Sequence, residues 1–426
     1  MTALGFVILI ALVVLGVPLW ISILATATYF VFCVIDIDPL LLGTLMFGSV
    51  SNSVILIAVP LFILSGQLMS KGGALQPIIR LSHAFLGHIP GGPAYALIAA
   101  NIVFAAMSGS GLAAVVGFAP IMIPVLTGLG YSLSFAVGLL ICSSTLANII
   151  PPAITPIFYG YITKTSVITL WTAGIIPGLM TALFLCITVY IYTRRGHYTR
   201  LPAADWRERK QALKEAWPII LMPVFVLAPL YGGVATPTEV SSIAAVYSLL
   251  LGTVFYRKLN FRLTLEAFHS TVSIMARVFI IVVVALLLNA IVTYVRLPFQ
   301  ISDWLSGLEL NWIWFMAIIA FAFLLMGAFL DPSAIMLVAV PILLPTILSL
   351  GIDKVSFGIF NSLAVNIAGI TPPYGLVLFA AMGMLNLPFH FVARACLMFY
   401  PALILALILI AFIPEISTWL PNLIGR

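Results

Sequence analysis

The sequence predicts an all-α polytopic membrane protein built as an inverted repeat, with about eleven transmembrane helices, two re-entrant hairpins and two interfacial arm helices. Three observations predict this fold class. The 426 residues are 63% hydrophobic and 7% charged, with a mean hydropathy of +1.24, which is a composition suited to lipid. The positive charges occur in clusters, which is typical of one side of a membrane. Prolines and glycines recur in the same register in the two halves of the chain.

The basic clusters indicate which segments face the cytoplasm. The densest of them runs from Arg194 to Lys214 and holds seven Lys and Arg residues. Because cytoplasmic loops carry such an excess, we place the basic clusters inside and the acidic loops outside. The net charge of +6 therefore reflects orientation in a membrane, and we expect no nucleic-acid partner. The other basic positions are Lys71, Arg80, Arg257, Lys258, Arg262 and Arg394, and the acidic ones are Asp36, Asp38, Asp303, Glu309, Asp353 and Glu415.

The apolar runs alternate across the membrane if the N-terminus lies outside, in the periplasm. Residues 1–35 contain no Lys or Arg, so no secretory signal is expected and the first run should remain as a span. The runs 91–127 and 312–350 must each enter and leave on one side, which predicts re-entrant hairpins. The expected division is scaffold helices in 1–70, an arm helix in 71–90, a hairpin and broken helix in 91–165, connecting and scaffold helices in 166–293, an arm helix in 294–311, a hairpin and broken helix in 312–387, and a C-terminal helix in 388–426.

The repeat appears when the sequence is shifted by 221 residues. An odd number of spans separates the two copies, so we expect them to lie in opposite orientations. Inverted repeats with broken helices near the middle of the membrane are typical of secondary transporters. The matching positions are Pro120 with Pro341, Pro124 with Pro345, Gly130 with Gly351, and Pro151-Pro152 with Pro372-Pro373.

Each copy contains a polar hairpin tip followed by a helix break. Paired prolines remove two backbone donors and push the preceding residue out of helical geometry, so carbonyls at the break need partners. Unwound carbonyls with Ser, Thr or Asn oxygens suit a dehydrated Na+, and the N-terminal ends of half-helices suit a carboxylate. The Na+ candidates are Ser108, Gly109, Ser110, Asn148, Ile149, Asp331, Asn366, Gly369 and Thr371. The substrate candidates are Ser110, Thr155, Asn366, Thr371 and Tyr374.

Three ionisable residues lie in or beside apolar runs, where such residues are functional candidates. Asp331, on the second tip, would neutralise a cation. Glu239 is expected to cap a helix together with Thr236 or Thr238. Arg277 pairs with Glu239 or extends towards the cytoplasm. Neither break carries an Arg, so an anionic substrate would rely on helix ends and hydroxyls.

Seven segments spread along the chain are together typical of one known family. They are AVPLFILSGQLMSKGG (58–73), LGHIPGGPA (86–94), MSGSG (107–111), NIIPPAITPIFYG (148–160), AGIIPGL (173–179), GGVATPTEV (232–240) and ITPPYG (370–375). In these segments, and along essentially its whole length, the chain resembles the large membrane subunit of tripartite ATP-independent periplasmic (TRAP) transporters. The resemblance implies a Na+-coupled importer of organic acids in the bacterial inner membrane, with an elevator mechanism and no cofactor. It also implies a small four-helix membrane subunit and a secreted binding protein as partners.

The resemblance also assigns cation sites and shows one departure. The first site carries over onto Ser108 and Ser110 with the break at Asn148, and the second onto Asp331 with the break over 366–371. Many members have an Asp shortly after the first Ser-Gly-Ser, where this chain has Leu112-Ala113-Ala114, which changes the charge balance at the first site. The resemblance leaves the substrate open among dicarboxylates, sialic acid and related acids.

The sequence disfavours two other functional classes and leaves a third as an alternative. An intramembrane enzyme is disfavoured because the five histidines are scattered, with no HExxH motif and no Ser-His or Asp pair at helical spacing. A channel is disfavoured because it would need a continuous polar face through the membrane, and the apolar runs of this sequence show none. A stand-alone anion/sodium symporter of similar architecture is the stronger alternative, and it would need no partners.

Overall fold

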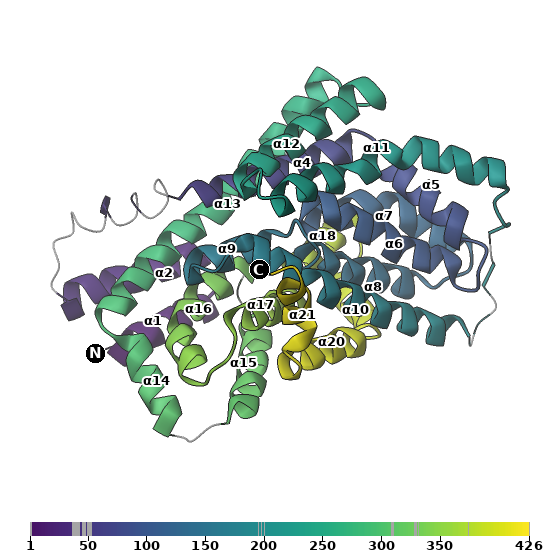
Figure 1. Ribbon diagram of the computed structural model, residues 1–426. Helices are drawn as coiled ribbons and strands as arrows, with labels where there is room; N and C mark the ends of the chain where they lie inside the picture. The colour runs from purple at the N-terminus through teal and green to yellow at the C-terminus, as the bar shows by residue number, and fades with distance from the viewer. Residues whose placement is uncertain are drawn as a thin grey trace.

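The computed structural model describes residues 2–35, 43–44, 48, 53–194, 196, 198–199, 201–307, 311–327, 330, 332–373 and 375–425, and these are helical with no strand among them (Figure 1). The first half contains α1 (Thr2–Val14), α2 (Leu19–Phe30), η1 (Val31–Ile35), η2 (Val54–Ile57), α4 (Ala58–Lys71), α5 (Leu75–Leu86), α6 (Gly92–Ser108), α7 (Gly111–Gly128), α8 (Leu133–Ser144), η3 (Thr145–Asn148), α9 (Ile154–Thr163) and α10 (Val167–Thr193). The second half contains α11 (Trp206–Tyr231), α12 (Pro237–Leu250), η4 (Leu251–Phe255), α13 (Phe261–Tyr294), α14 (Leu297–Gly307), α15 (Trp312–Gly327), α16 (Pro332–Ser349), α17 (Lys354–Ala368), α18 (Leu376–Leu385), α19 (Phe389–Cys396), α20 (Tyr400–Phe412) and α21 (Glu415–Leu423).

The helix boundaries follow the 221-residue repeat. Moving α7 from 111–128 by 221 gives 332–349, which are the bounds of α16. The same shift takes the start of α8 from 133 to 354, where α17 begins, and the start of α9 from 154 to 375, one residue before α18. The arm helix α5 moves from 75–86 to 296–307 and meets α14. Because the helix boundaries match after this shift without any gap, the repeated prolines mark a repeat of the structure as well as of the sequence.

The two copies also exchange contacts. In each copy the helix that follows the break packs on the second limb of the other copy's hairpin: α18 lies against α7, and α9 lies against α16. Such an exchange is what a two-fold relation between the copies produces. The two breaks therefore lie in one bundle of helices (Figure 1).

Seven helices are long and apolar enough to cross a membrane by themselves. The bent pair α19 and α20, with 53° between them, makes an eighth if it is one span. Two of the seven, α7 and α16, are second limbs of the predicted hairpins, so they are not among the eleven crossings that the sequence predicts, and that number stays a prediction. The seven are Val54–Lys71, Gly111–Gly128, Val167–Thr193, Trp206–Tyr231, Pro237–Phe255, Phe261–Tyr294 and Pro332–Ser349.

The C-terminal segment differs from the single helix expected over 388–426. It forms three helices, α19, α20 and α21. Pro401 lies in the first turn of α20, where its missing N–H costs nothing but where it cannot continue α19. Pro414 stands directly before α21, so prolines mark both interruptions.

The apolar side chains form one large core and two smaller ones. The large core joins the hairpins, the broken helices and α10. One smaller core lies among α1, α2, η1 and α13 and includes Phe30 and Leu287. The other includes Leu68 of α4 and Ala245 of α12. Many large apolar side chains are also exposed, such as Leu183 and Val246 at 58% each, which suits a surface that faces lipid.

Candidate cation and substrate site

The first hairpin tip is a tight turn between α6 and α7. Gly109 ends α6 with a φ of +57°, a backbone conformation that glycine adopts without steric cost. Ser110 is the N-cap of α7, and its Oγ accepts a hydrogen bond from the Ala113 N–H at 3.3 Å. The Ser110 N–H donates to Ser108 Oγ at 3.4 Å, and Ser108 is fully buried. Both hydroxyls predicted from the sequence are therefore held at the tip.

The first break lies directly against this tip. α8 passes into the 3₁₀ turn η3, the chain bends at Pro151-Pro152, whose peptide bond is cis, and α9 begins at Ile154. A Cβ built on Gly109 would collide with the Pro152 carbonyl oxygen, and one on Gly111 would lie 2.7 Å from the Ser144 carbonyl oxygen. The glycines thus let the tip approach two backbone oxygens of the break.

Asn148 belongs to the same cluster, whereas the Ile149 carbonyl points elsewhere. A Cβ on Gly111 would lie 3.3 Å from Asn148 Nδ2, which places that side chain at the tip. The Ile149 carbonyl oxygen lies against Gly174 of α10 instead, so closely that a Cβ there would overlap it. The carbonyls that meet the tip are those of Ser144 and Pro152, and sequence reasoning named neither residue among the candidate ligands.

The second tip and break show a comparable approach. α17 ends at Ala368, and α18 begins after Gly375, whose φ is +54°. A Cβ on Gly369 would lie 2.8 Å from Pro332 Cγ at the start of α16. Thr371 Oγ1 donates to the Ile367 carbonyl at 2.7 Å. Asp331 and Tyr374 lie outside the described residues, so their predicted roles stay predictions.

A hydrogen bond between two asparagines joins the breaks. Asn148 Nδ2 donates to Asn366 Oδ1 at 2.6 Å, and Asn366 Nδ2 donates to the Ser362 carbonyl at 2.5 Å. Asn366 is only 5% exposed. Because Asn148 donates through its nitrogen, its Oδ1 remains available as an acceptor.

Two aromatic donors satisfy carbonyls that the breaks release. Trp171 Nε1 on α10 donates to the Ala153 carbonyl at 2.9 Å. The Tyr400 hydroxyl on α20 donates to the Ile370 carbonyl at 2.6 Å. Since a backbone oxygen in hydrocarbon needs a partner, these side chains keep the breaks open without a ligand at those positions. Sequence reasoning missed both, although each is an aromatic residue with a polar handle inside an apolar helix.

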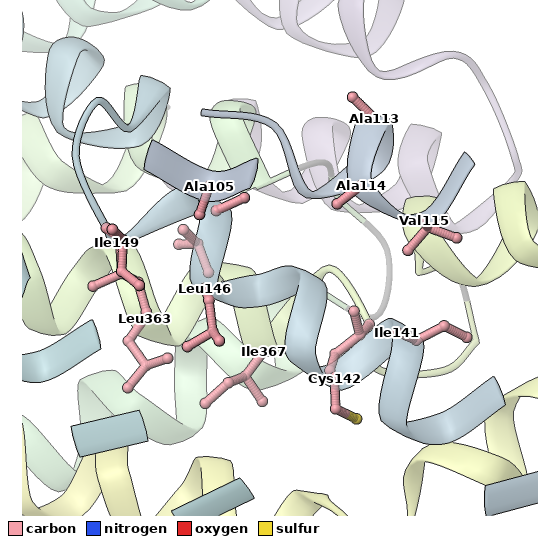
Figure 2. Close-up of a cluster of buried hydrophobic side chains, with 14 of the residues drawn as sticks. Ala105, Ala113, Ala114, Val115, Ile141, Cys142, Leu146, Ile149, Leu363 and Ile367 are labelled. Atoms are coloured by element: carbon pink, nitrogen blue, oxygen red, sulfur yellow. The ribbon is translucent and has the colours of Figure 1, made fainter. Parts of the chain in front are cut away.

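An apolar shell surrounds the polar cluster. Figure 2 shows Leu146 and Ile149 of the first break close to Leu363 and Ile367 of α17, and these side chains belong to the large core. The sequence over 92–163 and 355–385 carries no Asp, Glu, Lys or Arg. Neutral oxygens in such a low-dielectric shell interact strongly with a small cation.

The remaining candidates take separate positions. Thr155 is half-buried in the first turn of α9. Glu239 forms a capping box with Thr236, with its carboxylate 2.7 Å from the Thr236 N–H, which confirms the expected capping role. Arg277 is exposed and its Nε donates to the Ser273 carbonyl at 3.1 Å, so it does not use Glu239 as its partner.

Comparison with known families identifies the architecture. The model of the family described as "Tripartite ATP-independent periplasmic transporter, DctM component" matches residues 6–416. The chain belongs to this family. It is therefore the large permease component of a TRAP transporter, a multi-pass membrane protein and not an enzyme.

Several curated relatives cover nearly the whole chain. The C4-dicarboxylate TRAP transporter large permease protein DctM of Vibrio cholerae is 33% identical over 99% of this chain and 98% of its own. The sialic acid TRAP transporter large permease protein SiaM of the same organism is 32% identical over 96% and 95%. The ectoine TRAP transporter large permease protein TeaC of Halomonas elongata is 35% identical over the full length of both.

Solved structures share the fold at low identity. The Alcanivorax borkumensis YdaH transporter superposes with a TM-score of 0.61 at 16% identity, covering 89% of this chain and 91% of its own. MtrF of Neisseria gonorrhoeae gives 0.59 at 14%, covering 88% and 84%. At these identities the likeness concerns the fold alone.

Proposed function

We propose that this TRAP permease imports a small organic acid anion by Na+ symport across the bacterial inner membrane, with its N-terminus in the periplasm. A periplasmic binding protein delivers the substrate, and a small four-helix membrane subunit completes the complex. The observation that carries the proposal is the meeting of tip and break at Gly109 and Pro152, with the Asn148–Asn366 hydrogen bond beside it. Family membership supports the partners.

The first cation site is built from neutral oxygens. The Ser144 and Pro152 carbonyls approach the tip glycines, and Ser108, Ser110 and Asn148 supply further oxygen atoms nearby. Unwound carbonyls at a helix break are the ligands that transporters use for Na+. No carboxylate lies in 92–163, so a cation bound here keeps its positive charge, and that charge attracts an anion next to it.

The second site differs because it has a carboxylate. Asp331 is the only Asp, Glu, Lys or Arg in the sequence of 312–350, and Asn366, Gly369 and Thr371 belong to the break that follows. A bound cation paired with Asp331 would be electrically neutral. The two sites therefore contribute unequally to holding an anionic substrate, and the first contributes more.

The substrate lies where half-helices begin. The N-terminal ends of α7 and α9 carry partial positive charge, and Ser110 and Thr155 are located there. Asn366, Thr371 and Tyr374 supply polar groups from the second break. Relatives are named for C4-dicarboxylates, sialic acid and ectoine, which supports a small polar solute as the substrate.

The moving unit consists of the two hairpins and the two broken helices. They share one apolar core, in which α7 contacts α18 and α16 contacts α9. Shared packing of this kind is what a unit needs in order to move as one rigid body. The arm helices α5 and α14 connect it to the remaining helices. We propose an elevator movement of this unit against that scaffold.

Uptake in proteoliposomes tests the proposal. The complex should take up substrate only with the binding protein present and with Na+ outside, whereas uptake by this chain alone would support a stand-alone symporter. Asp331→Asn should raise the Na+ concentration for half-maximal uptake, because a carboxylate at depth stabilises a bound cation. Unchanged Na+ dependence in that variant would make Asp331 structural, and uptake without any Na+ would refute the symport.

A further inference from the structure

A second feature of the molecule lies away from the tips and breaks. It is an apolar cavity of about 450 Å³, here called the seam cavity, between the N-terminal pair α1–α2 and the second hairpin α15–α16. Every described residue that lines it is apolar, among them Phe6, Ile23, Phe323 and Val338. The cavity lies along the boundary between the large apolar core and the smaller core of α1, α2 and α13, since Val338 of α16 packs against both.

The seam cavity opens towards lipid. Ile10 and Leu325 line it and are 63% and 55% exposed. In a multi-pass membrane protein, exposed apolar side chains of membrane helices face the hydrocarbon of the bilayer. Water does not fill such a space, because apolar cavities without polar partners stay dry. An empty apolar cavity is also destabilising, increasingly so with its volume, so hydrocarbon is the medium that fills it.

The size of the seam cavity limits which kind of molecule can occupy it. An engineered cavity of roughly 150 Å³ accommodates a benzene ring, and this one is three times larger. A membrane-spanning helix about 10 Å wide and about 30 Å long occupies on the order of 2,000 Å³, so a whole helix of another subunit does not enter the cavity. An alkyl chain does fit, and its head group can remain at the membrane surface.

We propose that the seam cavity binds an acyl chain of a membrane phospholipid. Dispersion contacts and the burial of methylene groups hold the chain, and the lining offers no polar group for a head group. Recognition therefore depends on the chain and not on the head group. The chain fills the space between the N-terminal helices and the second hairpin, which keeps the two from packing directly onto each other there.

Photolabelling of the full-length chain in lipid nanodiscs tests this site. The probe is phosphatidylethanolamine with a diazirine in its acyl chain, and labelled peptides are mapped by mass spectrometry. We expect label on peptides from α1 and α16 at several times the level on the lipid-facing surface of α12. Unlabelled phosphatidylethanolamine and phosphatidylcholine with the same chains should compete equally.

Matched tryptophan substitutions separate binding in the cavity from general exposure to lipid. Val338→Trp fills the cavity and should reduce labelling of α1 and α16 severalfold. Val246→Trp makes the same change on an exposed surface of α12 and should leave that labelling unchanged. If Val338→Trp does not yield a monodisperse protein, Ala322→Phe fills the same cavity.

Four results would overturn the proposal. They are labelling of α1 and α16 no stronger than that of α12, labelling that survives filling of the cavity, competition that depends on the head group, and displacement by free palmitic acid at far lower concentration than by phospholipid. The last would identify a free fatty acid as the occupant.

Discussion

The hydrogen bond between Asn148 and Asn366 links the two helix breaks and allows a test that separates stability from ion coupling. The two side chains come from opposite copies of the repeat and meet at 2.6 Å. Leucine is close to asparagine in shape but has no polar atoms. The variants are therefore Asn148→Leu, Asn366→Leu and the two together.

The structure sets the expected energies. Each single change leaves the other amide without its partner in a place where Asn366 is 5% exposed, and an unsatisfied buried polar group costs about 1–3 kcal/mol. Replacing both partners removes that penalty. Coupling energies of such pairs within membranes average about 0.6 kcal/mol and reach about 1.7 kcal/mol. We expect the double variant to lose about 1 kcal/mol less free energy of unfolding than the sum of the losses in the two single variants. This difference corresponds to about a fivefold change in the unfolding equilibrium constant.

Uptake should not recover in the same way. The double variant regains much of the stability but supplies no amide oxygen to a cation at either break. We therefore expect Na+-driven uptake to stay low in all three variants. The assays are chemical unfolding in detergent and Na+-dependent uptake in proteoliposomes.

A control pair uses hydroxyls between α4 and α12. Ser65 Oγ and Ser248 Oγ are buried and lie 2.8 Å apart, so Ser65→Ala and Ser248→Ala should show a similar coupling energy with normal Na+ dependence. If the losses of unfolding free energy in the two single asparagine variants add up to the loss in the double variant, the hydrogen bond between them contributes nothing to stability. Normal Na+ dependence in the double variant would make the pair purely structural and refute the cation role.

Three further predictions follow from single contacts. Trp171→Phe removes the indole donor to a break carbonyl and should lower the free energy of unfolding by about 1–3 kcal/mol; an unchanged unfolding curve would contradict this. Gly174→Ala forces a Cβ onto the Ile149 carbonyl and should reduce both stability and uptake, whereas Gly128→Ala, where nothing lies within 4 Å, should reduce neither. In a cysteine-free background, Asp205→Cys should react with a membrane-impermeant reagent only from the cytoplasm, and labelling from outside would reverse the predicted orientation.

The sequence predicts the course of the helices well because prolines and glycines act locally. The predicted hairpin over 91–127 corresponds to α6 and α7, which run from Gly92 to Gly128. The predicted break at Pro151-Pro152 lies between η3 and α9. A proline removes its own N–H and restrains its neighbour whatever surrounds it, so these positions can be found without the rest of the fold.

The direction of each released carbonyl could not be predicted in this way. The Ile149 carbonyl turns to α10 because Gly174, 25 positions further along the chain, leaves room for it. The Ala153 and Ile370 carbonyls are satisfied by Trp171 and Tyr400, which belong to other helices. Such pairings depend on how distant helices pack, and neither periodicity nor local motif encodes that packing.

The crossed packing of the copies links the two proposed cation sites mechanically. Each site uses the tip and the break of one copy, yet the helix that leaves each break rests on the hairpin of the other copy, α18 on α7 and α9 on α16. A cation that pulls the first tip towards Pro152 would also move α7, and α18 would move with it because α18 packs on α7. α18 begins directly after the second break. The Asn148–Asn366 hydrogen bond ties the breaks together directly. Because coupling between binding sites is reciprocal, a cation that raises the affinity of the other proposed site by some factor should have its own affinity raised by the same factor when that site is filled. We therefore expect the two proposed cation sites to be occupied together.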